Sequence, residues 1–294
     1  MDIVPTLLDR CNDPFIFKGG TSLSKCHHLI NRMSEDIDLS FSMELFGEKE
    51  VVREPKRGRG KMQDEAKAID DKAREFVQAE LIKPLTAALM ALDSRITLEI
   101  ESEEPLNLGI HYPSVMEEGN AVLRRVLLET GSLSQNNPVS TVSINHMLGE
   151  HIDAFEEAPF DVVALDPART LLEKMFAVHC NLMSQASKPK YARHLYDILQ
   201  LHNKDNNWCE DKALMDQLVE FCDIHYRTNK EQCDAAREQQ LFLVPVDDMY
   251  DHYEKDWKEM ADMFPEGQLP YVFEDMLAEI KVLESHVNQV YYGK

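Results

Sequence analysis

The chain has 294 residues, of which 44% are hydrophobic, and it carries a formal net charge of −22. This length suffices for one large domain or for two smaller domains with their own cores. The charge argues against a protein whose whole surface binds nucleic acid, because each phosphate contact needs a lysine or an arginine, but it leaves room for a local basic site.

No run of about 18 apolar residues occurs, so no transmembrane helix and no membrane partner are expected. The first residues, MDIVPTLLDRCNDP, carry acids early and lack the basic start of a signal peptide. The six cysteines form no C-x-x-C pair and have no zinc-ligand spacing with histidine. We therefore expect reduced thiols and a cytoplasmic protein.

The first half of the chain predicts strands mixed with helices. The segment PFIFKGG (14–20) is typical of a buried strand that ends in a turn, and a helix is predicted over 21–32. The segment DIDLSFS (36–42) alternates polar and apolar residues with the period of a strand. Asp36 and Asp38 should therefore share one face of that strand.

A long amphipathic helix is predicted over 64–92. The segments RITLEIES (95–102), LNLGIHY (106–112) and RRVLLETGS (124–132) predict three further strands. The segment PVSTVSINHML (138–148) predicts one more.

From Asp166 onward the pattern is helical. Asp166 and Pro167 suit the N-cap and the first position of a helix, and a second helix is predicted over 191–202. This change of pattern predicts an α+β domain over 1–165 and an all-α domain over 166–294.

The turn after the first predicted strand has the composition of a triphosphate site. Gly19 and Gly20 allow backbone N–H donors to approach an anion closely, because neither has a Cβ. A helix start at Thr21 and Ser22 would add unpaired N–H groups and a favourable dipole. Lys25, about one turn further along, could reach the same anion.

Asp36 and Asp38 should lie about 7 Å apart on one strand face, which suits one or two Mg²⁺ ions in an in-line displacement. A Gly-Gly turn or an Asp-x-Asp alone is weak evidence, since half-exposed strands often carry acids. Their succession on strand, helix and strand is stronger, because both then lie at one end of one sheet. The spacing is not that of a P-loop, which disfavours an ATPase of that type.

The segment KGGTSLSK followed by RMSEDIDLSF resembles the signature of the AbiEii/AbiGii toxin family of nucleotidyltransferases, in the DNA polymerase β-like superfamily that includes the MenT toxins. RVLLETGS, with Glu129, resembles a later strand of that family that carries a carboxylate. RTLLEKMFAVH, with Glu173 and Lys174, resembles its helix with a Glu-Lys pair. RHLYDILQL, with Arg193 and Asp197, resembles its R-x-x-x-D element.

The resemblance implies an α+β fold, in which a polymerase-β-like nucleotidyltransferase core with a mixed sheet is followed by an all-α C-terminal domain. It also implies a toxin that is paired with a cognate antitoxin and that transfers a nucleotide from an NTP to an RNA, notably tRNA, with Mg²⁺ or Mn²⁺. In this interpretation Asp36 and Asp38 bind the metal ions, Lys174 contacts the triphosphate, and Asp197 is a further catalytic or orienting acid. The triphosphate would be bound by Gly19, Gly20, Thr21, Ser22, Lys25 and Lys174.

The identity of a third metal-binding carboxylate is open at this point. Glu129 is the first candidate, and Glu99 and Glu101 are rivals on another predicted strand. Glu129 also shares a strand face with Arg125, so a structural Arg-Glu pair competes evenly with metal binding.

Lys174 borders the apolar side of its helix, where a lysine is costly unless it meets an anion. An internal partner, Asp197 or Glu173, is the alternative to a phosphate and is compatible with it. Arg193 and Asp197 are spaced i, i+4, so a plain surface pair is a fair alternative for them.

Other polar residues have plainer interpretations. Arg32 and Ser34 are expected to position or cap the start of the Asp-x-Asp strand, and His27 and His28 to be ordinary residues of the short helix. The basic segment REPKRGRGK (53–61) favours a solvated loop over an RNA or triphosphate contact.

Two alternatives to RNA nucleotidyl transfer stay open. A similar core could modify a protein or a small molecule, which fits the charge of −22 better than tRNA does. The chain could also be a non-catalytic NTP-binding or partner-binding protein, although it retains the acids and the lysine that transfer needs.

Overall fold

The structure, a computed structural model, describes residues 7, 10–101, 106–113, 125–131, 135, 137–145 and 158–294. Contacts divide the chain into two compact units. The sheet unit comprises Met1–Cys26 and Ser34–Leu165, and the helical unit comprises His27–Met33 and Asp166–Lys294. The short segment 27–33 thus belongs to the helical unit, although it lies within the first 165 residues. The sequence does not predict this.

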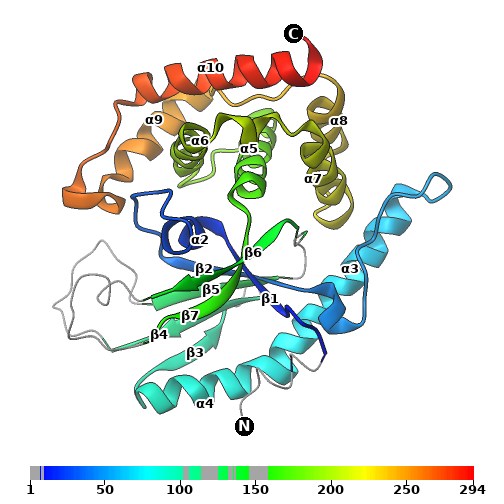
Figure 1. Cartoon of the computed structure of the whole chain (residues 1–294), viewed down its shortest axis with the longest axis vertical. Helices are drawn as coiled ribbons and strands as arrows, with labels where there is room; N and C mark the ends of the chain where they lie inside the picture. The colour runs from blue at the N-terminus through cyan, green and yellow to red at the C-terminus, as the bar shows by residue number, and fades with distance from the viewer. Residues whose placement is uncertain are drawn as a thin grey trace. The chain divides into compact units, whose positions relative to one another are not determined.

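The sheet unit contains a mixed seven-stranded sheet with the order β3-β4-β5-β2-β1-β7-β6. Its strands are labelled in Figure 1. Strand β1 is antiparallel to β2 and parallel to β7, whereas β2 is parallel to β5. The predicted α+β class with a mixed sheet and a helical C-terminal part is confirmed. The strands are β1 (Phe15–Lys18), β2 (Asp36–Phe41), β3 (Thr97–Ile100), β4 (Asn107–His111), β5 (Arg125–Gly131), β6 (Val139–Ile144) and β7 (Phe160–Leu165).

Strand β7 is not among the strands predicted from the sequence, although its segment, FDVVAL, is a short apolar run. Short apolar runs do not show by periodicity alone whether they form strands or buried helices. The last residues of the predicted strand over 138–148 lie outside the described residues.

The sheet unit contains one long, continuous helical stretch. It consists of α3 (Arg59–Phe76), a π-helical turn (Val77–Leu81) and α4 (Ile82–Leu92). It begins five residues before the predicted start at residue 64. The last part of the basic segment 53–61 is therefore helical, and only its first part is a loop.

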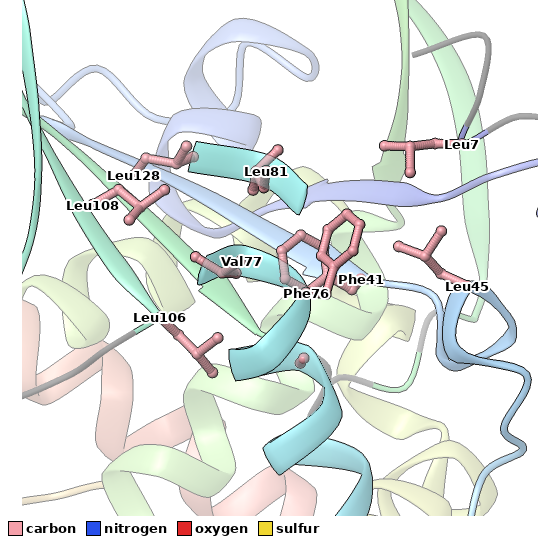
Figure 2. Packing of buried hydrophobic residues seen from close by; sticks show 10 residues of the cluster. Leu7, Phe41, Leu45, Phe76, Val77, Leu81, Leu106, Leu108 and Leu128 are labelled. Atoms are coloured by element: carbon pink, nitrogen blue, oxygen red, sulfur yellow. The ribbon is translucent and has the colours of Figure 1, made fainter. Parts of the chain in front are cut away.

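The core of the sheet unit lies on one face of the sheet. Figure 2 shows Phe41 of β2 beside Phe76 of α3, with ring centroids 5.5 Å apart in an edge-to-face arrangement. Ile37 and Leu39 pack against the same cluster. Because side chains alternate along a strand, Asp36 and the other polar residues of β2 face the opposite side.

The predicted helix over 21–32 is wrong in its second half. Helix α2 (Gly19–Lys25) ends seven residues earlier, and His28 has a left-handed backbone with φ of 52°. The backbone N–H of Asn31 donates to the hydroxyl of Tyr196 at 3.2 Å. Tertiary contacts with the helical unit thus replace the helix that the local sequence favours, and both adjacent histidines lie outside it.

The helical unit packs α5 against α6, α7 and α8 (Figure 1). The predicted cap at its start is confirmed, because Asp166 Oδ1 accepts from the N–H of Ala168 at 2.8 Å. Across the described residues, no helix is long and apolar enough to cross a membrane. The helices are α5 (Pro167–Ser184), α6 (Ala192–Lys204), α7 (Lys212–His225), α8 (Lys230–Glu238), α9 (Asp248–Glu259) and α10 (Phe273–Tyr292), with short 3₁₀ turns between them.

Candidate functional site

Gly19 and Asp38 are in direct contact in the sheet unit. Lys18 lies opposite Asp38 in the antiparallel β1–β2 pair, so the residue that follows β1 lies next to the aspartate. A Cβ built on Gly19 would overlap Asp38 Oδ2 and would come 2.6 Å from its Cγ. Gly19 also has φ of 74°, a conformation that favours glycine. The Gly-Gly turn and the Asp-x-Asp strand therefore form one site.

Thr21 provides a second link between the turn and the strand, because its hydroxyl donates to the main-chain carbonyl of Asp36. Ser22 is buried and lies beside the thiol of Cys26. Burial raises the pKa of that thiol, and the Ser22 hydroxyl partly opposes this rise. Ser22 is thus part of the packing under the turn, whereas Lys25 is half-exposed.

Glu129 is the cross-strand neighbour of Asp38 in the parallel β2–β5 pair. Neighbouring strands lie about 4.8 Å apart, and residues in register share a face. Asn107 of β4 is the next member of this row, and its amide Nδ2 lies 3.5 Å from Glu129 Oε1. Lys18, Asp38, Glu129 and Asn107 thus form one row across four strands.

The rival acids lie elsewhere. Glu99 is on β3, the third strand from β2, which places it about 14 Å from the strand of the aspartates. Glu101 forms an ion pair with Arg125, the arginine that shares a face with Glu129 in the sequence. Arg125 thus has Glu101 as an ion-pair partner, and Glu129 lies in register with Asp38.

Asp36, Asp38 and Glu129 offer only oxygen donors, which suit a hard cation such as Mg²⁺. In the part of the chain that is described, no group of three acids, histidines or cysteines is arranged to hold a metal by itself. Mg²⁺ at nucleotide sites commonly uses one or two carboxylates together with substrate phosphates and waters. The half-buried pair Asp36 and Asp38 fits that pattern.

The opposite face of the sheet has a different character. A hollow of about 480 Å³ there is lined mainly by apolar residues of β1, β2, β6 and β7, among them Phe17 and Leu39. An apolar lining cannot compensate the charge of a triphosphate. The polar face with Asp36 and Asp38 is therefore the better candidate site.

In the helical unit, Lys174 and Asp197 form an ion pair that also includes Arg32. Asp197 is fully buried; its Oδ2 lies 2.9 Å from Lys174 Nζ and 2.6 Å from Arg32 Nη2. Its Oδ1 accepts from Arg32 Nε at 2.7 Å. Burial alone would raise the pKa of Asp197, but the charges of Lys174 and Arg32 outweigh it and hold this pKa well below its usual range.

The internal partner expected for Lys174 is thus Asp197. The alternative of an exposed Arg193–Asp197 pair is wrong, because Asp197 is buried and its carboxylate binds the other two cations. His194 is half-buried, with its Nδ1 shielded from solvent, and desolvation followed by the charge of Lys174 holds its pKa well below the usual value. The cluster therefore combines two cations, one carboxylate and a neutral imidazole.

The structure brings Gly19, Thr21, Asp36, Asp38 and Glu129 together in the sheet unit, whereas Lys174 and Asp197 belong to the other unit. No contact joins Ser22 or Lys25 to the aspartates among the contacts described. The sequence does not single out Lys18 or Asn107, which only the strand register reveals. It also does not pair Arg32 with Asp197, because 165 residues separate them. The short distance of Arg32 from the Asp-x-Asp strand in the sequence is the one signal that could have drawn attention to it.

A search of curated proteins found no match to the chain. Among solved structures, the MenT4 nucleotidyltransferase toxin from Mycobacterium tuberculosis is similar at 16% identity and a TM-score of 0.40, over 97% of this chain and 87% of that one. The family model described as "Nucleotidyl transferase AbiEii toxin, Type IV TA system" matches residues 7–279. This match spans both units and confirms the resemblance seen in the sequence. The chain belongs to the AbiEii family of nucleotidyltransferase toxins from type IV toxin–antitoxin systems.

Proposed function

We propose that this nucleotidyltransferase toxin transfers a nucleotide from an NTP to an RNA acceptor of the tRNA kind, with Mg²⁺ or Mn²⁺. The observation that carries the proposal is the contact between Gly19 and Asp38, which joins a turn suited to phosphates with a pair of carboxylates. Family membership implies an antitoxin as the partner of the protein.

In the proposed reaction, an acceptor hydroxyl attacks the α-phosphorus of the NTP. A new P–O bond forms to the acceptor, the bond to the β-phosphate oxygen breaks, pyrophosphate leaves, and the hydroxyl proton passes to solvent. A divalent ion at Asp36 and Asp38 would neutralise charge on the triphosphate and on the leaving group. Glu129 extends the same row of acids and is proposed as the third carboxylate.

Two groups of residues are proposed to interact with the triphosphate. Gly19, Gly20 and Thr21 are proposed to bind the triphosphate through backbone N–H groups, which glycine leaves accessible. Lys174 is proposed to add positive charge; it shares the single carboxylate of Asp197 with Arg32, which leaves it capacity for an anion.

A protein or small-molecule acceptor is the second candidate, and the net charge of −22 favours it. The basic segment 53–61 does not remove this objection. Arg57, in its centre, is paired with Glu54 and Glu65. Part of the positive charge in the segment is thus already matched by acids of the same chain.

The test is incubation of the purified protein with Mg²⁺, total RNA and each labelled NTP in turn, with Asp38→Asn in parallel. Asp71→Asn is the matched control, because Asp71 is an exposed acid of α3 paired with Lys67. We expect label on RNA with the unsubstituted protein and with Asp71→Asn, but not with Asp38→Asn. Label on a protein instead of RNA supports the second acceptor class, and NTP binding without transfer supports a non-catalytic protein.

A further inference from the structure

The segment 27–33 is attached to the helical unit by its backbone as well as by a side chain. The N–H of Met33 donates to the carbonyl of Met263 at 2.6 Å, and the N–H of Asn31 donates to the Tyr196 hydroxyl at 3.2 Å. Between these two residues, the side chain of Arg32 is only 1% exposed. The same short segment leads directly into β2, which begins at Asp36.

The guanidinium of Arg32 binds Asp197 through two nitrogens, one to each carboxylate oxygen. Bidentate pairs of this kind restrict direction as well as distance, because the planar fork of arginine matches the plane of the carboxylate. Lys174 Nζ adds a third contact, at 2.9 Å. Asp197 thus binds Arg32, in the segment before β2, and Lys174, in α5, at the same time.

Asp197 is poorly placed to accept a proton from an acceptor hydroxyl. A general base must come within hydrogen-bond reach of the proton that it removes, and the carboxylate of Asp197 is fully buried. Both of its oxygens already accept from cations of the chain. An exchange with substrate would require at least one of these contacts to break.

A buried ion pair is weak evidence for a role in stability. Removing charges from water is costly, and apolar residues of similar volume often stabilise a fold as well as a buried ion pair does. The ion pair fixes the relative direction of its side chains, whereas apolar packing does not. That geometry involves Lys174, which the proposed function places at the triphosphate, and the segment that precedes the Asp-x-Asp strand.

We propose that Asp197 is a positioning residue, which acts on nucleotidyl transfer through Arg32 and Lys174 and takes no proton from the acceptor. The inference rests on the proposed function for its effect on the reaction. Its structural part, the attachment of segment 27–33 by Asp197, can be measured without any activity.

The first measurement is hydrogen–deuterium exchange of the amides of Asn31 and Met33 in Asp197→Asn. The matched control is Asp223→Asn, since Asp223 is a buried acid of the same unit that pairs with Arg237 of α8. We expect exchange at both amides to become about tenfold faster in Asp197→Asn, because charge-assisted hydrogen bonds are lost, and to stay unchanged in Asp223→Asn. Unchanged exchange in Asp197→Asn overturns the proposal.

The second measurement is the pH profile of transfer. As a positioning residue, Asp197 should contribute no ionisation to the profile, so Asp197→Asn lowers kcat about tenfold or more at every pH and leaves the shape of the curve intact. Loss of the acidic limb in this variant would identify a proton acceptor and overturn the proposal. If the unsubstituted protein transfers no nucleotide, the proposed function fails while the exchange result still stands.

Arg32→Lys is the second variant in case Asp197→Asn does not fold. It keeps the positive charge and removes the bidentate fork. We expect faster exchange at Asn31 and Met33 and a reduced kcat with an unaltered pH profile. An Arg32→Lys protein with normal exchange and normal kcat contradicts the proposal.

Discussion

Asp38 lies so close to the α-carbon of Gly19 that a Cβ added to the glycine would overlap the carboxylate and displace it. The aspartate and the glycine turn, separated by nearly twenty residues in the chain, are thereby parts of one surface. The contact depends on the antiparallel pairing of β1 and β2, and it is the feature from which the first prediction follows.

Gly19→Ala should abolish transfer activity and destabilise the sheet unit by more than the roughly 1–3 kcal/mol of an unfavourable backbone conformation. Gly47→Ala is the matched control, because Gly47 also has a left-handed backbone, with φ of 70°, but a Cβ added there would meet no atom within 4 Å. We expect Gly47→Ala to lose about 1 kcal/mol and to keep its activity. Urea unfolding and the transfer assay measure both effects, and equal losses in the two variants would contradict a role for the Asp38 contact.

Removal of either aspartate should weaken metal-dependent NTP binding without loss of fold. Asp36→Asn and Asp38→Asn keep the side-chain size and remove a negative charge. This charge repels the phosphates of NTP unless Mg²⁺ neutralises it, so NTP binding by the variants should no longer depend on Mg²⁺. We expect kcat to fall roughly a hundredfold or more. Equilibrium dialysis with Mg²⁺ and with EDTA is the measurement, and an unchanged Mg²⁺ dependence in both variants would exclude these carboxylates as the metal site.

The third carboxylate can be identified by a pair of matched variants. Glu129→Gln should lower kcat about tenfold, in the range of residues that support a metal site, because Glu129 lies in register with Asp38. Glu99→Gln should have less than about a twofold effect, since Glu99 is on the third strand from β2. A larger loss in Glu99→Gln would reverse the assignment.

His179 should make the helical unit sensitive to acid. Its ring stacks with those of Phe176 and Phe242, with centroid distances of 6.0 and 5.6 Å. Its Nδ1 accepts from the Phe242 N–H at 3.1 Å, and its Nε2 lies 3.0 Å from the carbonyl of Gln232. Burial lowers the pKa of His179 from 6.5 to about 4. The native state therefore holds this imidazole neutral while the unfolded chain takes up a proton.

It follows that the free energy of unfolding decreases as the pH falls from about 6.5 to about 4, by at most roughly 3 kcal/mol from this group. Urea titrations across this range should show a shallower decrease in His179→Gln than in the unsubstituted protein. His286→Gln, at an exposed histidine, is the control for substitution of a histidine outside the core. Parallel curves for all three proteins would show that His179 does not titrate as its burial predicts.

The cysteines should react slowly in the native protein. None of the six forms a disulfide, which agrees with the reduced thiols expected from the sequence. Burial raises the pKa of Cys180 to about 12 and that of Cys209 to about 11, so little thiolate is present near pH 8. Iodoacetamide should label these two residues only after unfolding in urea, and rapid labelling of the native protein at either would contradict the raised pKa values.

Features that depend on residues close together in the chain could be predicted from the sequence. The alternation in 36–41 assigned the two aspartates to one face, because a strand has a period of two. Asp166 and Pro167 marked the start of α5, because an N-cap acts within one helical turn. The motif around Gly19 identified the family for the same reason, since its residues lie close together in the chain.

Contacts between residues far apart in the chain depend on the fold and could not be predicted in this way. Glu129 and Glu99 are equivalent acids in the sequence, and strand order alone separates them. The helix predicted beyond Lys25 ends early, because contacts of segment 27–33 within the helical unit, such as that of Asn31 with Tyr196, outweigh a weak local preference. Asp197 accepts from Arg32 across 165 residues, a pairing that depends on the packing of the whole helical unit and on no local pattern.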